Sequence, residues 1–330
     1  MELVIKSFII LILFHASDSL EACNEDTKSI SLDNVNIQIQ DNQINFNLFR
    51  DQEIVLNGLL GQDLNLENLP DPVICSEDQT CLDFASLAKL TINSKDEVCH
   101  QVTWETNHLK SLKDCFNLDN DHQWYGGPEE YYQRFPMNKE FQRDMVPYLP
   151  GDMLQDSKKY FGGVAEPYWL TSKGVSIWVP EGIPLFYSWN SDSSQGQICL
   201  SAQDIFPYEQ QDTLHLRYTV CSMDNPRDMH LYAIENFLGK PSGIPDETMM
   251  RDPIWSSWAQ YKANINESTI LNFAQTINDN GFAVSQIEID DNWESCYGDA
   301  VFDTQENKFP DPKGLISTIK ERLCKSVKFI

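Results

Sequence analysis

The sequence has few basic residues and lacks the common zinc-binding and phosphate-binding patterns. Its 330 residues include 24 Lys and Arg against 50 Asp and Glu, a formal net charge of −26. Such a chain repels a phosphate backbone or an anionic membrane surface, so nucleic acid and membrane are not expected partners. The cysteines form no CxxC pair and no Cys/His cluster with zinc spacing, and we predict no metal or cofactor. The acidic balance suits a neutral substrate, and it equally suits a role in solubility alone.

Long hydrophobic runs are absent except at the start of the chain. Residues 8–14 (FIILILF) follow Lys6, and the small residues before Ser19 suit cleavage there. This pattern predicts a signal peptide over residues 1–19, with a core too short to span a bilayer comfortably. The protein is then secreted or lies in the lumen of the secretory pathway. A signal-anchored membrane protein is the alternative.

The cysteine content fits an oxidising compartment, where disulfides are expected. Cys199 and Cys221 flank strand-like segments and are one candidate pair, and some of the four cysteines between Cys75 and Cys115 are others. The odd number leaves one thiol free or without its partner, and the connectivity stays open. The nine cysteines are Cys23, Cys75, Cys81, Cys99, Cys115, Cys199, Cys221, Cys296 and Cys324.

One glycosylation sequon supports the same compartment. Asn266, Glu267 and Ser268 form an N-x-S pattern, which predicts a glycosylated surface position at Asn266.

Period-two alternation predicts an antiparallel β-sandwich over residues 20–225. Val35, Ile37 and Ile39 alternate with polar residues, and Gly, Asn and Asp punctuate such runs. Further alternating runs occur at residues 44–48, 174–179 and 214–220.

Residues 226–245 predict a helix followed by a linker. Leu231, Ile234 and Leu238 recur at helical spacing, and Gly239 can end the helix. The Pro, Ser and Gly residues that follow are typical of a linker.

Residues 246–330 predict alternating strands and helices, the start of a parallel α/β domain. Strands are expected over residues 254–261 and 282–290. The first helix is capped by Asn266 or Ser268 and ends at Gly281. The second helix opens at Asp311-Pro312 with proline in its first position. The expected buried helix residues are Ile270, Leu271, Phe273, Ala274, Ile277, Leu315, Ile316 and Ile319.

The predicted α/β domain is short for a (β/α)8 TIM barrel. A barrel takes roughly 250 residues, and only 78 residues (330 − 252) follow Asp252. Residues 325–330 lack the glycine turn and apolar run of a third strand. We therefore expect a truncated domain with the first two β/α units, from a partial gene model or an alternative transcript.

Two glycine-aromatic segments lie within the predicted sandwich. Residues 122–129 (HQWYGGPE) suit a hairpin loop on the core and suit equally a loop that lines a sugar cleft. His122 is expected to pack or to form hydrogen bonds. Residues 161–169 (FGGVAEPYW) lack GxGxxG spacing, so they predict a strand entry with aromatic core residues and no phosphate site.

The strongest candidate site follows the second predicted strand, where Asp290, Asp291, Asn292 and Trp293 occur in sequence. In a (β/α) barrel the carboxyl ends of the strands carry the active site. Carboxylates can bind sugar hydroxyls while an aromatic ring stacks on the apolar face. A polar turn is the alternative. Adjacent strand residues point to opposite sides, so the two aspartates suit substrate binding and not an acid/nucleophile pair.

Two tryptophans open the predicted α/β part. Trp255 and Trp258 lie in residues 252–261 (DPIWSSWAQY), at or near the first strand. They suit packing of the barrel, or one of them suits the floor of a sugar subsite at the mouth of the barrel.

Five segments together resemble glycoside hydrolase family 31, and most closely its myogenesis-regulating glycosidase branch. The segments, in order, are WYGGPE at 124–129, FGG at 161–163, DPIW at 252–255, IDDNW at 289–293 and FPDPKG at 309–314. The resemblance implies a β-sandwich followed by a (β/α)8 barrel and retaining hydrolysis of α-linked sugars. The resemblance to this branch implies an α-galactosidase-like preference for the substrate.

The resemblance also implies roles for particular residues. Asp290 matches the aspartate of the strand-two motif that binds the sugar at the cleavage point. Trp293 matches the aromatic residue three positions on, and Trp255 matches the strand-one aromatic. Val301 and Phe302 stand where the family often has Asp-Phe, so that contact is not carried over. The nucleophile and acid/base of the family lie on later strands, and no catalytic residue is assigned in this chain.

The sequence thus predicts an α-galactosidase-like or α-glucosidase-like enzyme of family 31, represented by its sandwich and first barrel units. The expected substrate-binding residues are Asp290, Asp291, Trp293, Trp255 and Trp258, and the expected substrate is an α-linked galactoside or glucoside. The alternatives are a secreted carbohydrate- or partner-binding sandwich module and a non-functional truncated product.

Overall fold

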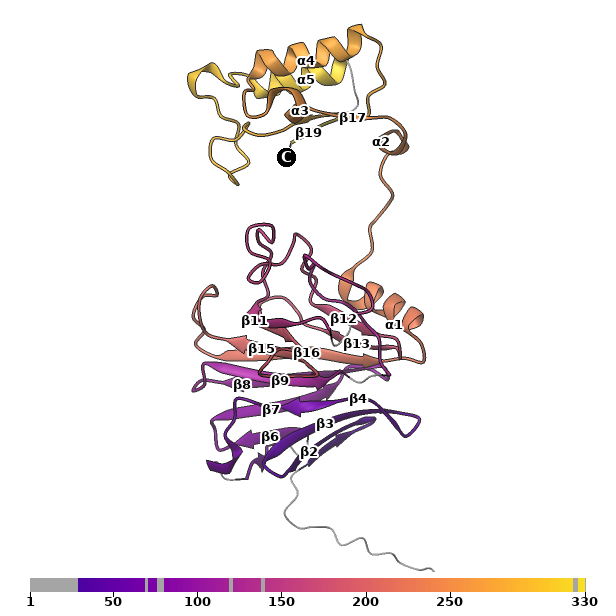
Figure 1. Cartoon of the computed structure of the whole chain (residues 1–330), viewed down its shortest axis with the longest axis vertical. Coiled ribbons are helices and arrows are strands. Elements are labelled where there is room, and N and C mark those ends of the chain that lie inside the picture. Colours follow the sequence, from indigo (N-terminus) through magenta and orange to yellow (C-terminus); the bar gives the residue numbers. More distant parts are fainter. Residues whose placement is uncertain are drawn as a thin grey trace, which may run out of the picture. The chain divides into compact units, whose positions relative to one another are not determined.

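The computed structural model divides into two compact units, and the boundary between them in the chain lies between Gly239 and Lys240 (Figure 1). The two units are described separately. The structure describes residues 29–68, 71–75, 80–118, 121–137, 140–322 and 326–329. The predicted signal peptide lies outside these residues.

The first unit is built from two antiparallel sheets of eight strands each, which confirms the predicted sandwich. In spatial order the first sheet contains β1 (Ser29–Leu32), β2 (Val35–Gln40), β3 (Gln43–Arg50), β4 (Glu53–Leu60), β9 (Ser111–Asn117), β15 (Gln197–Gln203), β14 (Leu185–Trp189) and β11 (Arg143–Pro147). The second contains β10 (Trp124–Gly126), β12 (Tyr168–Thr171), β13 (Val175–Trp178), β16 (Leu214–Ser222), β8 (Cys99–Thr106), β7 (Ala88–Ser94), β6 (Cys81–Phe84) and β5 (Val73–Ile74).

Alternating side chains of these strands supply the core of the sandwich. Val35 and Ile37 on β2 lie directly opposite Leu48 and Phe46 on β3, and all four are buried. The intervening polar residues face the other side of the sheet. One continuous apolar cluster therefore contains residues of both sheets.

Two disulfides join directly opposed residues of neighbouring strands. Cys99 on β8 pairs with Cys221 on β16, and Cys115 on β9 pairs with Cys199 on β15. The suggested pairing of Cys199 with Cys221 is therefore wrong, because the two residues lie in different sheets and each faces another cysteine.

The remaining cysteines divide into three groups. A third disulfide joins Cys75 and Cys81. Cys296 is a free, exposed cysteine. Cys23 and Cys324 lie outside the described residues. Three disulfides fit an oxidising compartment such as the cell exterior.

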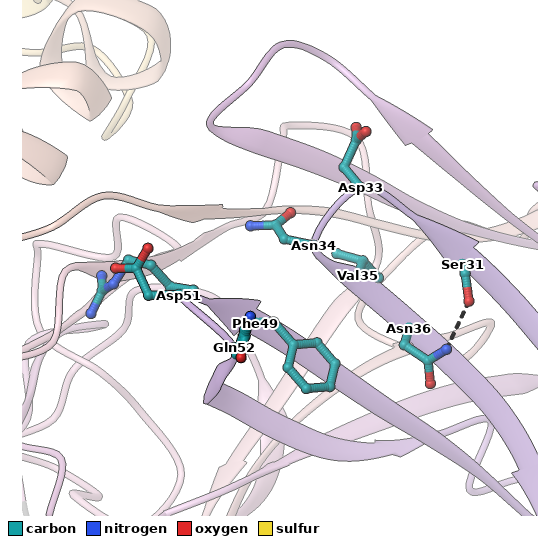
Figure 2. A pocket seen from close by; sticks show the side chains of 9 residues that line it. Ser31, Asp33, Asn34, Val35, Asn36, Phe49, Asp51 and Gln52 are labelled. Carbon is teal, nitrogen blue, oxygen red and sulfur yellow. Dashed lines mark hydrogen bonds between the residues drawn. The ribbon is translucent and has the colours of Figure 1, made fainter. Parts of the chain in front are cut away.

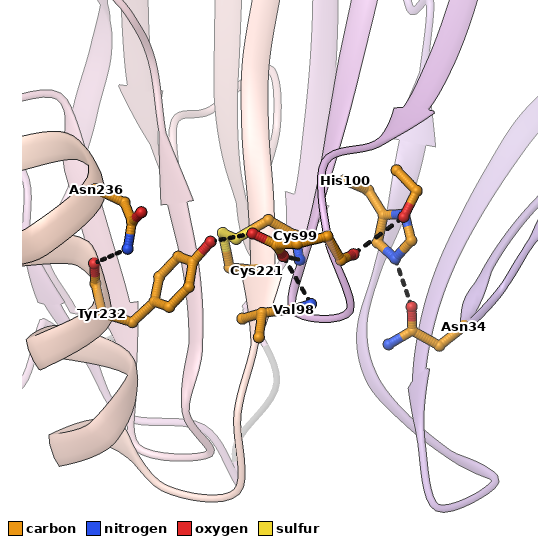
Figure 3. Close-up of a disulfide and its surroundings, with 9 residues drawn as sticks. Asn34, Val98, Cys99, His100, Cys221, Tyr232 and Asn236 are labelled. Carbon is orange, nitrogen blue, oxygen red and sulfur yellow. Dashed lines mark hydrogen bonds between the residues drawn. A yellow bond between two sulfur atoms is a disulfide. The ribbon is translucent and has the colours of Figure 1, made fainter.

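The helix at the end of the first unit packs beside the Cys99–Cys221 disulfide (Figure 3). Helix α1 (Pro226–Ala233) continues into a π-helical turn, η2 (Ile234–Leu238), and Gly239 follows with a φ of 78°. The Tyr232 hydroxyl donates a hydrogen bond to Asp96. The helix and its glycine stop agree with the sequence expectation.

A buried carboxylate connects the two sheets. Asp114 on β9 accepts hydrogen bonds from Trp104 Nε1 at 3.0 and 3.1 Å, from the Tyr218 hydroxyl at 2.8 Å and from the Gly61 amide at 2.7 Å. Burial raises the pKa of Asp114 to about 7, against the opposing effect of these hydrogen bonds, which favour the ionised form.

The second unit is a β-α-β-α-β arrangement around a parallel sheet in the order β17-β18-β19. Helices α4 and α5 pack against one face of this sheet and share an apolar cluster with it (Figure 1). Its elements are α2 (Glu247–Arg251), β17 (Ile254–Ser256), α3 (Trp258–Tyr261), α4 (Glu267–Asp279), β18 (Gln286–Ile289), η3 (Gln305–Asn307), α5 (Pro312–Arg322) and β19 (Ser326–Phe329). A further short 3-10 helix, η1 (Leu66–Asn68), belongs to the first unit.

Three sequence expectations for the second unit are corrected. The predicted strand over residues 254–261 ends at Ser256, because the buried Ser257 is followed by the helical turn α3. The strand predicted over residues 282–290 is shorter and begins at Gln286. A third parallel strand, β19, pairs with β18 although its sequence lacks an apolar run, since parallel pairing is made by backbone groups.

The two long helices follow the sequence prediction more closely. Asn266 caps α4 by accepting a hydrogen bond from the Thr269 amide, and Gly281 follows the helix with a φ of 65°. Pro312 opens α5, on which Leu315 and Ile319 are buried and Ile316 is half-buried. Over the described residues, no helix combines the length and apolar character needed to cross a membrane.

We expect Asp114 to make the sandwich less stable as pH rises from about 4 to about 7. The folded state holds a proton that the unfolded state releases at the ordinary aspartate pKa, so deprotonation favours unfolding across this window. The expected measurement is denaturant unfolding followed by tryptophan fluorescence for the wild type and Asp114→Asn. Their difference in unfolding free energy should change through the window, because asparagine does not titrate.

The control for this measurement is Asp41→Asn, at an exposed turn between β2 and β3. It shows what the same substitution does outside the core. A difference for Asp114→Asn that stays constant through the window would contradict the role assigned to Asp114.

Candidate functional site

The candidate site lies at the carboxyl end of β18, next to the end of β17. Ile287 and Ile289 on β18 are fully buried in the cluster formed with α4 and α5. Glu288 and Asp290 are half-buried and belong to the opposite face. The parallel pairing places Ser256 opposite Glu288, so the polar ends of both strands meet at one edge.

Asp290 is held in place by Ser256, the last residue of β17, and by Ser257, which follows it. Its amide donates to Ser257 Oγ at 3.0 Å, and its Oδ2 accepts a hydrogen bond from Ser256 Oγ at 3.2 Å. Ser257 is completely buried, and its own amide donates to the Glu288 carbonyl at 3.0 Å. These bonds fix the backbone at Asp290 and orient its carboxylate.

Asp291 turns toward a different partner. The Tyr297 hydroxyl donates to both carboxylate oxygens of Asp291, each at 2.8 Å. This hydrogen bond to Asp291 is the main cause that raises the pKa of Tyr297. The ring of Tyr297 stays 80% exposed. The Asp291 amide donates to Asp290 Oδ1 at 2.7 Å, so the two residues are in contact although the hydroxyl partners of their carboxylates differ.

The loop that carries Tyr297 is closed by its own hydrogen bonds. The Glu294 carboxylate accepts bonds from the amides of Gly298 at 2.9 Å and Ala300 at 3.0 Å. Gly298 has a φ of 88°, which suits glycine. No spacing rule in the sequence links Tyr297, Ser256 or Ser257 to the aspartates, so their roles become visible only in the structure.

The three tryptophans differ in their surroundings, and two of them pack. Trp255 donates from Nε1 to the Ala283 carbonyl at 2.9 Å and lies against Phe273 and Phe282, next to α4. Trp293 is only 8% exposed and packs on Phe302 with 4.9 Å between ring centroids.

Trp258 is the most exposed of the three, at 41%. The ammonium group of Lys262 lies 5.0 Å from its ring centroid. The expected site residues thus separate into a polar group, Asp290 with Asp291, and tryptophans whose contacts are largely structural. Tyr297 is the exposed aromatic ring that contacts an aspartate of the site.

The described residues contain no group of three or more His, Cys, Asp or Glu side chains arranged to hold a metal ion.

The two glycine-aromatic segments of the first unit lie side by side. The Glu129 amide donates to the Val164 carbonyl at 2.7 Å, and the Gly162 amide donates to the Glu129 carbonyl at 2.9 Å. Trp124 and Phe161 are buried in the sandwich core. These contacts give both segments a structural role, and His122 is buried, as expected.

A hollow of about 600 Å³ lies between two turns of the first sheet (Figure 2). Asn34 Oδ1 is 2.6 Å from His100 Nε2, and Asn36 Nδ2 donates to Ser31 Oγ at 2.8 Å. The half-buried Phe49 supplies an aromatic side chain to the wall. The lining residues are Ser31, Asp33, Asn34, Val35, Asn36, Phe49, Arg50, Asp51 and Gln52.

A β-sandwich is followed by a parallel α/β unit with carboxylates at a strand end, and the sequence of this chain is glycosidase-like. The chain is 31% identical over 242 residues to the myogenesis-regulating glycosidase of Mus musculus, covering 70% of this chain and 33% of that protein. It is 32% identical over 168 residues to the SITS-binding protein of Tetronarce californica, covering 51% and 22% respectively. The chain thus spans about a third or less of the length of these relatives.

Solved structures of family 31 proteins share the fold. A GH31 sulfoquinovosidase from E. rectale matches with a TM-score of 0.56 at 14% identity, covering 91% of this chain and 47% of that one. A xylosidase from Aspergillus niger matches with a TM-score of 0.51 at 14% identity, covering 90% and 34%. No family model matches the sequence. The chain is therefore similar in sequence to a glycosidase and shares the fold of these solved structures, in line with the resemblance of its motifs.

We expect Ser257→Ala to lower the unfolding free energy of the second unit by about 1–3 kcal/mol. The substitution removes the acceptor of the Asp290 amide in a fully buried position. Ser317→Ala on the exposed side of α5 is the matched control and should change stability little. Hydrogen exchange at the Asp290 amide is the direct measurement, and an unchanged rate in Ser257→Ala would contradict the assigned bond.

Proposed function

We propose that this chain contributes the sandwich and the first part of a (β/α)8 barrel to a retaining α-glycosidase of the family 31 type. The observation that carries the proposal is the pair of oriented aspartates at the carboxyl end of a parallel strand. Active sites of (β/α)8 barrels are built at this end of the strands. The sequence relationship to a glycosidase supports the same assignment.

In this proposal Asp290 binds sugar hydroxyls. Its carboxylate is oriented by Ser256, and its backbone by Ser257, before any ligand arrives. A carboxylate held in this way can accept hydrogen bonds from a hydroxyl pair at little further entropic cost. Asp291 then acts mainly through Tyr297, whose exposed ring can lie against the apolar face of a sugar.

The reaction itself needs two carboxylates on either side of the glycosidic bond. In a retaining enzyme one attacks the anomeric carbon while the other protonates the leaving oxygen, and water later releases the sugar. Asp290 and Asp291 are assigned to binding only. We assign the nucleophile and the acid/base to barrel strands other than those described. The proposed substrate is an α-linked galactoside or glucoside.

The compartment in this proposal is the secretory lumen or the cell exterior. The three disulfides support it, because such bonds persist in oxidising surroundings. The signal peptide over residues 1–19 is the proposed means of entry.

Sequencing the transcript past the codon for Ile330 tests whether the protein contains the rest of the proposed barrel. An in-frame continuation with aspartates at two later strand ends supports the glycosidase, and an assay on α-galactosides and α-glucosides then distinguishes the substrates. A stop codon after Ile330 excludes catalysis by this product and supports the binding-module alternative.

In a form with the complete barrel, Asp290→Ala should weaken sugar binding by about 1–3 kcal/mol, because a charged hydrogen bond is lost. The measurement is the inhibition constant of a bound sugar together with kcat/KM. Asp279→Ala at the exposed end of α4 serves as the control. Unchanged kinetics in a correctly folded Asp290→Ala variant would contradict the role of Asp290.

The hollow beside Phe49 favours a second candidate, in which the sandwich itself binds a neutral sugar. Its wall combines an aromatic ring with amides and carboxylates, the groups that recognise sugars. Phe49→Ala should then abolish retention on the sugar matrix that binds the wild type. Phe206→Ala is the control, since Phe206 is 90% exposed and is not among the residues that line the hollow. Equal retention of both variants, or no retention of the wild type on any neutral sugar, would exclude this candidate.

A further inference from the structure

The sequon at Asn266 coincides with the start of α4. Asn266 is exposed, and its Oδ1 accepts hydrogen bonds from the Thr269 amide at 2.9 Å, the Thr269 hydroxyl at 2.9 Å and the Ser268 hydroxyl at 2.7 Å. The carbonyl oxygen of the side chain thus serves as the helix cap.

The other side-chain atom of Asn266 is available. Among the described residues no hydrogen bond involves Asn266 Nδ2. N-linked glycosylation uses this nitrogen and retains the carbonyl oxygen. The cap and a glycan therefore use different atoms of one amide, and modification leaves the start of α4 intact.

A polar groove of about 520 Å³ lies next to Asn266. Several residues that line the groove carry amide or carboxylate groups, namely Asn264, Asp303, Gln305 and Asn307. These groups suit the hydroxyl and acetamido groups of a sugar.

The wall of this groove is attached to the first turn of α4. The Glu267 amide donates to the Lys308 carbonyl at 2.8 Å, and the Glu267 carboxylate accepts a bond from the Asp311 amide at 2.9 Å. The middle residue of the sequon therefore holds the 303–308 loop beside the glycosylation site.

We propose that Asn266 carries an N-linked glycan whose first sugar lies in this groove. In the transfer, Nδ2 loses a proton and bonds to the anomeric carbon of the oligosaccharide. The bond from that carbon to a lipid diphosphate donor breaks, and the lipid diphosphate leaves with the electron pair. The proposal rests on entry into the secretory pathway and is independent of any glycosidase activity.

The test of modification expresses the whole chain in a eukaryotic secretory cell. Peptide mass spectrometry of the wild type and Ser268→Thr should find a glycan at Asn266 that a glycan-removing amidase releases. Asn266→Asp and Ser268→Ala should carry none. Asn266→Asp retains an oxygen that can cap α4, so its unfolding midpoint should stay near that of the unglycosylated Ser268→Ala variant, which keeps Asn266.

An unmodified Asn266 in wild-type chain with its disulfides formed would overturn the proposal. Recovery of the chain only from the cytosol, where the transfer does not occur, would overturn it as well. Neither result bears on sugar hydrolysis, so the proposed glycosidase function is judged separately.

Hydrogen exchange tests the position of the first sugar. Amides of residues 303–308 should exchange more slowly in the glycosylated wild type than in the unglycosylated Ser268→Ala variant, which keeps Asn266. Amides of α5, outside the groove, provide the internal reference. Equal exchange over residues 303–308 would show that the glycan leaves the groove empty and would overturn that part of the proposal.

Discussion

Successive side chains of a β-strand point to opposite faces, and both units of this chain are organised by that alternation. In the sandwich it sends Val35 and Ile37 into the core between the sheets. In the parallel unit it sends Ile287 and Ile289 against the helices and leaves Glu288 and Asp290 on the other face. The candidate site is thus the polar half of a strand whose apolar half holds the unit together.

Strand pairing then determines which distant residues become neighbours. Cys99 and Cys221 lie 122 residues apart and face each other only because β8 and β16 are adjacent in register. Asp114 acts across the sheets in the same way, since two of its donors, Trp104 and Tyr218, belong to the opposite sheet. A carboxylate at this depth is compatible with folding because hydrogen-bond donors surround it.

Neighbouring groups set the chemistry of the polar residues in the second unit. Asp290 is oriented by the two serines at the end of β17, whereas Asp291 accepts a hydrogen bond from Tyr297, six positions along the chain. The side-chain oxygen of the exposed Asn266 caps α4, whereas no hydrogen bond of the described residues involves its side-chain nitrogen. The proposed sugar contact at Asp290 and the proposed glycan at Asn266 therefore depend on different side-chain contacts.

The sequence alone predicted the sandwich, the helix stopped by Gly239, the helix between Asn266 or Ser268 and Gly281, the helix opened by Asp311-Pro312, and the strand that leads to Asp290. It could do so because periodicity and capping are local properties. Its ordered motifs also indicated the relationship to family 31. It did not predict the disulfide pairing, the third parallel strand, the end of β17 at Ser256 or the contact between Tyr297 and Asp291. These features depend on register and on packing between residues far apart in the chain, which only the tertiary structure decides. The same reason explains why the contacts of Trp255 with Phe273 and of Trp293 with Phe302 were not predicted from the sequence.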